Sequence, residues 1–218
     1  MSDIASPTVL LNQLCKGIDS LGFTPEDHPV DAYLAYLDLL ATWNKTYNLT
    51  AVDKPQKSVS YHVLDSLSVL PYISGKRNLD IGSGAGLPGL VLALARPDHD
   101  WVLLDSNNKK IRFINQAIIE LKLNNIEPVQ CRIEEYNPEV QFTSITARAW
   151  GKLIDLYKVT EHLLSPDGNI LAMKGPGVKQ ELSSLDKHSV NYQLHNLDVP
   201  GVQGERLLVE ISALPSCK

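Results

Sequence analysis

The chain has few cysteines: of its 218 residues only Cys15, Cys131 and Cys217 carry a thiol, and no two of them form a C-x-x-C pair. An odd number of isolated cysteines argues against a disulfide framework and against a structural zinc site. The six histidines are also scattered, without an H-E-x-x-H motif. These absences predict a reduced, cytoplasmic protein that holds no metal.

The sequence also lacks an uninterrupted apolar run long enough to cross a bilayer, so we expect no membrane association. Its first residues, MSDIASPTVL, have no basic region followed by an apolar run, which predicts no secretory signal. Positive charge is not in excess, because 20 Lys and Arg stand against 25 Asp and Glu, a net charge of -5. Any nucleic-acid partner would therefore need a local basic face. The remaining composition, 44% hydrophobic and 21% charged, is that of a folded globular chain.

The first third of the chain has a helical pattern. Between Val30 and Ala41, apolar residues recur at three- and four-residue steps, which is typical of an amphipathic helix. Thr24 suits the N-cap of that helix, with Pro25 in its first turn. A second helix is predicted over residues 62–70, ending at the following proline.

From residue 77 onward, short apolar strands alternate with helices. This alternation predicts an α/β fold with a Rossmann-like, mostly parallel and doubly wound sheet. The last two predicted strands have no helix between them, so they should form an antiparallel hairpin at one edge. Residues 72–218 would make this domain, and residues 1–71 an N-terminal helical extension packed on it. The predicted strands are 78–81, 101–104, 128–131, 142–146, 169–173, 188–197 and 206–211, the helices 87–95, 109–121 and 153–164, and a turn lies at 166–168.

A glycine-rich segment, NLDIGSGAGLPG at residues 78–89, joins the first predicted strand to a helix. Gly82, Gly84 and Gly86 would let the backbone approach a ligand closely, and the helix N-terminus behind them offers unpaired N–H groups. Leu87 and Pro88 open the helix, where the missing N–H of proline costs nothing. This segment predicts a nucleotide-cofactor loop.

Two ligands fit this loop. Residues 84–89 satisfy G-x-G-x-x-G and Asp105 lies about 20 residues on, so an NAD-dependent dehydrogenase is a competing interpretation. However, Gly82 and Ser83 are extra residues ahead of that fingerprint, and Asp80 at the strand tip would repel a pyrophosphate. The same carboxylate could accept hydrogen bonds from, or offset the charge of, a ligand with a sulfonium and an ammonium group. The pattern therefore favours S-adenosyl-L-methionine and a class I methyltransferase.

Further candidate contacts follow the next strands. Asp105 ends the second strand, where its two oxygens suit the paired hydroxyls of a ribose; the alternative is a helix N-cap. Ile133 and Glu134 follow the third strand, where an adenine would be held, although the glutamate could instead lie in a solvated helical turn. Arg148 follows the fourth strand and could bind the cofactor carboxylate in bidentate fashion. The D/N-P-P-Y tetrad common in methyltransferases of amino groups is absent here, which indicates a different acceptor atom.

Several motifs together make the chain similar to the ribosomal RNA small subunit methyltransferase G family, also called glucose-inhibited division protein B. The resemblance extends over nearly the whole chain, with Ser83 where Thr is common and Trp150 where Phe is common. Its motifs are WNKxYNLT from Trp43, HxxDSL from His62, LDIGSGAGLPGLVLALARPD from Leu79, LLDSNNKKIRFI from Leu103, NNIEPVQCRIEEY from Asn124, TxRA from Thr146, LAMKG from Leu171 and VPGVQGERLLVEI from Val199.

The resemblance implies methylation of guanine N7 at position 527 of bacterial 16S rRNA, with S-adenosyl-L-methionine as the cofactor. It implies cofactor contacts at Gly82, Leu87, Ile133, Glu134 and Arg148. The expected partner is 16S rRNA or the small ribosomal subunit, and the expected oligomeric state is a monomer. Guanine N7 has a lone pair and no proton, so no general base is required and no catalytic residue is assigned.

RNA contact would need a local basic face. Trp43, Tyr47 and Trp150 could stack an extruded base, but Trp43 at helical spacing fits a core position equally well. His62 and Asp65 could pair where the helical extension meets the domain. A non-catalytic RNA-binding scaffold stays as an alternative to the enzyme. The basic candidates are Lys45, Lys54, Lys57, Lys109, Lys110, Arg112, Lys152, Lys174 and Lys179.

Overall fold

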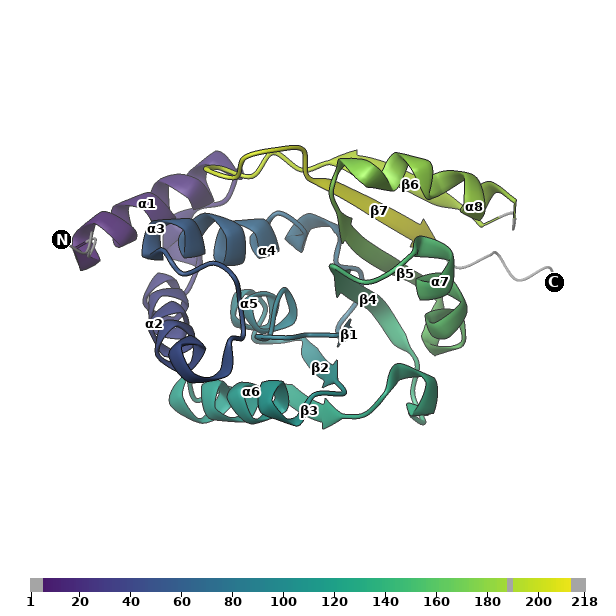
Figure 1. Ribbon diagram of the computed structural model, residues 1–218, viewed down its shortest axis with the longest axis horizontal. Coiled ribbons are helices and arrows are strands. Elements are labelled where there is room, and N and C mark those ends of the chain that lie inside the picture. Colours follow the sequence, from purple (N-terminus) through teal and green to yellow (C-terminus); the bar gives the residue numbers. More distant parts are fainter. Residues whose placement is uncertain (1–5, 188–189, 213–218) are drawn as a thin grey trace.

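A seven-stranded sheet forms the centre of the protein in the computed structural model, which describes residues 6–187 and 190–212 (Figure 1). The strand order is β3-β2-β1-β4-β5-β7-β6. The first five strands pair in parallel, and β7 pairs antiparallel with both β5 and β6. This confirms the predicted doubly wound sheet with an antiparallel edge hairpin. The strands are β1 Arg77–Ile81, β2 Asp100–Asp105, β3 Ile126–Gln130, β4 Phe142–Arg148, β5 Leu164–Lys174, β6 Tyr192–Asn196 and β7 Leu207–Ser212.

The strand order reverses between β1 and β4. After β1 the chain adds β2 and β3 on one side, then crosses back to place β4 and β5 on the other. In open α/β sheets, ligands bind in the crevice outside the carboxyl ends of the strands at such a switch point. The ends of β1, β2 and β4, where the candidate residues lie, therefore meet at the expected place for a ligand.

Helices cover both faces of the sheet and build two cores. One core joins α1, α2, α5 and α6 to one face, and the other core holds α7 and α8 against the opposite face. Alternate residues of β2 divide between them, because Leu103 faces the first core and Val102 and Leu104 face the second. The helices are α1 Pro7–Ser20, α2 Val30–Tyr47, α3 Pro55–Ser58, α4 Asp65–Leu67, α5 Gly89–Ala95, α6 Asn108–Glu120, α7 Leu153–Thr160 and α8 Leu182–Asp186.

Helix α5 is buried along its whole length, GLVLALA. A helix that is apolar all round needs partners on every side, and here the sheet lies on one side and the N-terminal helices on another. Trp43 of α2 packs edge-on against Phe113 of α6, with ring centroids 5.7 Å apart, and stacks on Tyr47 at 5.2 Å. Of the two interpretations of Trp43, the structure therefore supports the packing one.

Several predicted boundaries were wrong. Pro25 lies in a separate 3₁₀ turn, Pro25–Asp27, and α2 begins only at Val30 after Pro29, so Thr24 is not its N-cap. The predicted helix over 62–70 begins earlier, at Pro55, and passes through a π-helical turn, Val59–Leu64.

At the other end of the domain, the predicted turn at 166–168 lies inside β5 as an irregularity in its pairing with β4. The predicted strand 188–197 is observed over Tyr192–Asn196, while residues 188 and 189 lie outside the described residues.

Across the residues described, no helix combines the length and the apolar character needed to span a membrane. The same part of the chain holds no group of three or more His, Cys, Asp or Glu side chains placed to bind a metal ion.

Candidate functional site

The glycine loop between β1 and α5 has the conformation that only glycines adopt easily. Gly82, Gly84 and Gly86 have φ angles of 62°, 59° and 81°. A Cβ built on Gly84 would come no nearer than 3.8 Å to the carbonyl oxygen of Gly82 and 4.0 Å to Lys110 Nζ, so the loop surface there is open. A loop that exposes its backbone at a sheet's switch point fits a bound nucleoside cofactor.

The loop is held from three directions. The Ser83 hydroxyl donates to the carbonyl oxygen of Asp80 at 2.8 Å, and the Leu87 N–H donates to the carbonyl oxygen of Ser83, also at 2.8 Å. The Tyr36 hydroxyl, which comes from α2, donates to the carbonyl oxygen of Ala85 at 2.7 Å. Burial raises the pKa of Tyr36, so its hydroxyl stays protonated and able to donate. Sequence reasoning missed Tyr36, because only the packing of α2 brings its hydroxyl to Ala85, which lies 49 residues further along the chain.

The prediction that Asp80 faces the ligand was wrong. Its side chain is fully buried, and its two oxygens accept hydrogen bonds from the Thr146 hydroxyl at 2.9 Å and from the Gly89 N–H at 3.1 Å. The carboxylate thus joins the ends of β1 and β4 to the start of α5. Burial raises the pKa of Asp80 from 3.8 to about 6, against the lowering effect of these hydrogen bonds.

Asp105 lies at the end of β2, beside the glycine loop. One carboxylate oxygen accepts from the Gly84 N–H at 2.9 Å and from Lys110 Nζ at 3.3 Å, and the other accepts from the Asn107 N–H at 2.9 Å. Its side chain is almost completely buried. The alternative role as N-cap of α6 is wrong, because Asn107 caps that helix by accepting from the Lys109 N–H. Asp105 therefore fixes the loop against the end of β2.

The remaining predicted cofactor residues differ in exposure. Ile133 and Glu134 lie in the 3₁₀ turn Ile133–Glu135 after β3, where the isoleucine is buried in the core and the glutamate is exposed. Leu87 is also buried, so its backbone, not its side chain, lines the loop. The structure brings all of these groups to the carboxyl ends of β1, β2 and β3.

Arg148 ends β4 and contacts the N-terminal helices. Its Nη1 donates to the carbonyl oxygen of Tyr61 at 3.0 Å and lies 3.3 Å from Asp65 Oδ2. Asp65 Oδ1 lies 3.3 Å from Nε of Arg206, the residue before β7. Burial raises the pKa of Asp65, and the two guanidinium groups act in the opposite direction. Asp65 therefore places two arginines together, and sequence reasoning missed Arg206 because it lies far along the chain.

Tyr61, whose carbonyl oxygen accepts from Arg148, lies in the π-helical turn Val59–Leu64. In such a turn the backbone hydrogen bonds run from i to i+5, which displaces carbonyl groups from their ordinary helical partners. The loop between β6 and β7 crosses back to this turn (Figure 1), where the Gln203 N–H donates to the Tyr61 hydroxyl at 3.1 Å. The suggested pairing of His62 with Asp65 was wrong. Instead, Nε2 of His62 lies 3.2 Å from the Thr50 hydroxyl. Burial lowers the pKa of His62 from 6.5 to about 4.

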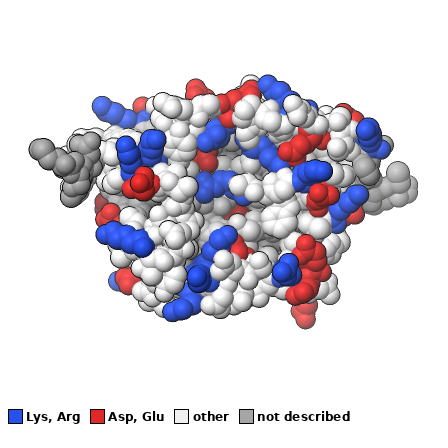
Figure 2. All heavy atoms as spheres, viewed as in Figure 1, with Lys and Arg blue, Asp and Glu red and all other residues white. Residues whose placement is uncertain are grey.

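Basic side chains cross the middle of the face shown in Figure 2, with acidic side chains between them. Of the basic candidates, Lys110 pairs with Asp105, Lys174 with Glu181, and Lys179 with Glu205. Their charges are therefore partly offset within the chain.

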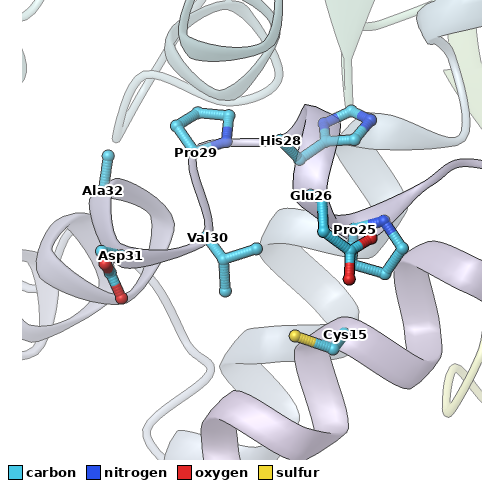
Figure 3. A pocket seen from close by; sticks show the side chains of 8 residues that line it. All are labelled: Cys15, Pro25, Glu26, His28, Pro29, Val30, Asp31 and Ala32. Carbon is cyan, nitrogen blue, oxygen red and sulfur yellow. The ribbon is translucent and has the colours of Figure 1, made fainter.

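A separate hollow of about 550 Å³ lies among the N-terminal helices (Figure 3). Its lining comes from Cys15 of α1 and the segment Pro25–Ala32, away from the glycine loop. Within this lining, His28 Nδ1 lies 3.2 Å from the hydroxyl of the buried Tyr33.

The sheet topology, the open glycine loop at its switch point and the carboxylate that fixes this loop define a class I, S-adenosylmethionine-dependent methyltransferase. A family model described as rRNA small subunit methyltransferase G matches residues 30–209, and the chain belongs to this family. The chain is 48% identical over 200 residues to ribosomal RNA small subunit methyltransferase G of Nitrosococcus oceani, covering 92% of this chain and 94% of that protein. It is 42% identical over 205 residues to the protein of the same name from Psychromonas ingrahamii, covering 94% and 99%.

Solved structures agree on the fold. An S-adenosylmethionine-dependent methyltransferase from Aquifex aeolicus superposes with a TM-score of 0.59 at 15% identity, covering 77% of this chain and 97% of that chain. Precorrin-6y C5,15-methyltransferase from Geobacter metallireducens gives 0.57 at 12% identity, covering 68% and 87%. At these identities the likeness concerns the fold alone.

Proposed function

We propose that the protein methylates N7 of guanine 527 in 16S rRNA, with S-adenosyl-L-methionine as the methyl donor. The observation that carries the proposal is the open glycine loop held by Asp105 at the switch point of the sheet. Family membership supports the RNA substrate, since the relatives from Nitrosococcus oceani and Psychromonas ingrahamii are named as small subunit rRNA methyltransferases.

Within the site, we assign the glycine loop, at Gly82, Gly84 and Leu87, to the methionine end of the cofactor. We assign Asp105 to the ribose, because its Oδ1 accepts one hydrogen bond from the chain and has a second lone pair. We assign the turn at Ile133 and Glu134 to the adenine.

Arg148 would bind the cofactor carboxylate with guanidinium nitrogens other than Nη1, which is held by Tyr61 and Asp65. The Asp65 contact holds the arginine side chain in one orientation, so the binding group is positioned before the ligand arrives.

In this reaction the main role of the protein is to position the two reactants. The bound cofactor supplies an electrophilic methyl group, and guanine N7 attacks it through a lone pair, so the chain has no proton to remove. The residues must align the base with the sulfur–methyl bond and exclude water. This agrees with the segment at the carboxyl end of β4, which reads Arg148-Ala149-Trp150-Gly151 instead of D/N-P-P-Y. It also agrees with His62, whose lowered pKa and burial make it a neutral structural residue at pH 7.

We further propose that residues 1–71 form a helical extension of the domain 72–218. The packing of α2 and α4 against α5, together with the bond from Tyr36 to the glycine loop, supports this assignment. We also propose that the protein is a monomer, that it is cytoplasmic and that it acts on the small ribosomal subunit.

The test is transfer of a tritiated methyl group to small subunits from cells that lack this protein. We expect one methyl group per subunit, at a guanine that becomes sensitive to borohydride and aniline cleavage, the chemical signature of N7 methylation. Arg148→Ala should weaken S-adenosyl-L-methionine binding in calorimetry and reduce transfer, whereas exposed Lys76→Met should change neither. Tight binding of NAD without binding of S-adenosyl-L-methionine would refute the proposal, and cofactor binding without methyl transfer to RNA would favour a scaffold.

A further inference from the structure

The loop after β4 holds an aromatic ring over the glycine loop. Trp150 is half-buried, and a Cβ built on Gly82 would lie 3.3 Å from Cε3 and Cζ3 of its ring. The preceding residue, Ala149, has a φ of 56°, in the left-handed region that a residue with a Cβ rarely adopts. Such a conformation persists only when surrounding contacts hold it. The contacts that fix this loop therefore decide where the ring of Trp150 lies.

Lys174, at the end of β5, supplies those contacts. Its side chain is only 9% exposed, and its Nζ donates to the carbonyl oxygens of Trp150 and Gly151. It also lies 3.1 Å from Oε2 of Glu181. A lysine ammonium has three donors, and here three groups of the chain take them. Lys174 therefore cannot bind a phosphate without releasing the loop.

Glu181 completes the arrangement from the other side. The same Oε2 accepts from the Leu153 N–H at 2.8 Å, at the start of α7, where the N-cap residue Lys152 makes no capping bond with its own side chain. A helix N-terminus is stabilised by such an acceptor and by a nearby negative charge. Lys174 and Glu181 together thus fix both ends of the segment 150–153.

We propose that Trp150 is the surface on which the target guanine stacks, and that Lys174 and Glu181 are positioning residues that hold it beside the methyl donor. The inference rests on the proposed function. Proteins that modify a base in RNA hold the extruded base by stacking it on aromatic rings. A ring next to Gly82, where the methionine end of the cofactor would lie, brings such a base within reach of in-line attack.

The first test compares two substitutions that change the charge in opposite directions. Lys174→Met removes a positive charge and Glu181→Gln removes a negative one, yet both break the pair. We expect each to lower kcat/KM for RNA about tenfold while the Kd for S-adenosyl-L-methionine changes less than about twofold. The double variant should lose little more than either single variant, because the two residues act as a unit. Lys76→Met, which breaks an exposed ion pair at the amino end of β1, is the matched control.

The dependence of KM on salt separates positioning from direct RNA contact. A lysine that neutralises a phosphate of single-stranded RNA contributes about 0.7 to the slope of log affinity against log salt. We expect the slope of Lys174→Met to equal that of the wild type. A reduced slope, or tighter RNA binding by Glu181→Gln, would overturn the positioning role.

A second readout does not depend on activity. The contribution of Trp150 to fluorescence is isolated by subtracting the signal of Trp150→Phe, which retains the nearly inaccessible Trp101 and the packed Trp43. Acrylamide should quench Trp150 more strongly in Lys174→Met and Glu181→Gln than in the wild type, and unchanged quenching would overturn the positioning role. If the wild type methylates no RNA, the proposed function fails, while the quenching result still decides whether the pair holds the loop.

Stacking itself is tested on Trp150. Trp150→Phe should keep kcat/KM for RNA within about threefold, and Trp150→Leu should lower it by about tenfold or more, as expected for a lost base–aromatic stack. Equal activity of the Phe and Leu variants would refute stacking.

Discussion

Replacing Asp80 by asparagine should change how the stability of the protein depends on pH. The Asp80 carboxyl is fully buried at the junction of β1, β4 and α5, and its pKa is raised from 3.8 to about 6. The asparagine side chain would have nearly the same shape, with its oxygen toward the Gly89 N–H and its amide toward the Thr146 hydroxyl, which can accept as well as donate. The substitution therefore removes the titration and preserves both contacts.

The magnitude follows from the shift of the pKa. A raised pKa means that the folded state binds the proton more tightly than the unfolded state, so the contribution to stability is full below about pH 4 and is lost as the pH rises through about 6. The shift of about two units corresponds to about 3 kcal/mol. The free energy of unfolding of Asp80→Asn, relative to the wild type, should therefore rise by about 3 kcal/mol between pH 4 and pH 7.

The assay is urea unfolding of both proteins at half-unit steps from pH 4 to pH 7, monitored by circular dichroism. The difference between the two curves isolates Asp80, because other titrating groups contribute equally to both. His62 makes this subtraction necessary, since its shift acts with the opposite sign over an overlapping range. A difference that stays constant with pH, or that falls toward neutrality, would refute the account of Asp80 as a desolvated carboxylate.

Two further substitutions test the same region. His62→Gln should remove a loss of stability on acidification. Because the folded pKa of His62 is lowered to about 4, its contribution to the free energy of unfolding is present above pH 6.5 and falls by about 3 kcal/mol as the pH falls to 4. The same titration against the wild type measures this, and parallel curves would contradict it. Gly89→Ala should lower the free energy of unfolding by about 1–3 kcal/mol, since its Cβ would lie 2.7 Å from Cβ of Asp80. Gly177→Ala, where a Cβ meets no atom within 4 Å, is the control, and equal stability of the two alanine variants would refute the packing argument.

The sequence predicted the features that depend on local patterns. Strand and helix alternation, the edge hairpin and the glycine loop follow from periodicity and from residue types whose backbone preferences are local, and the structure confirms each of them. Boundaries were less predictable. Pro25 fits a helix start by its type, yet the chain makes a separate 3₁₀ turn there before α2 begins.

The site depended on contacts between residues far apart in sequence. The type and position of Asp80 suggested a group facing the ligand, but its burial and its bonds to Thr146 and Gly89 give it a structural role. Likewise, Asp65 lies 83 residues before Arg148, and nothing in the spacing of either indicates that the two side chains meet.

The class of fold, the position of the cofactor loop on the chain and the family thus all follow from the pattern of residues. Those properties depend on motifs whose backbone conformation is set by neighbouring residues, at the end of a strand or the start of a helix. Tertiary packing determines which polar groups around the loop are bonded within the chain and which face outward. That division depends on burial and on pairings such as Tyr36 with Ala85 and Lys174 with Trp150, which exist only once the N-terminal helices and the ends of β4 and β5 have packed together.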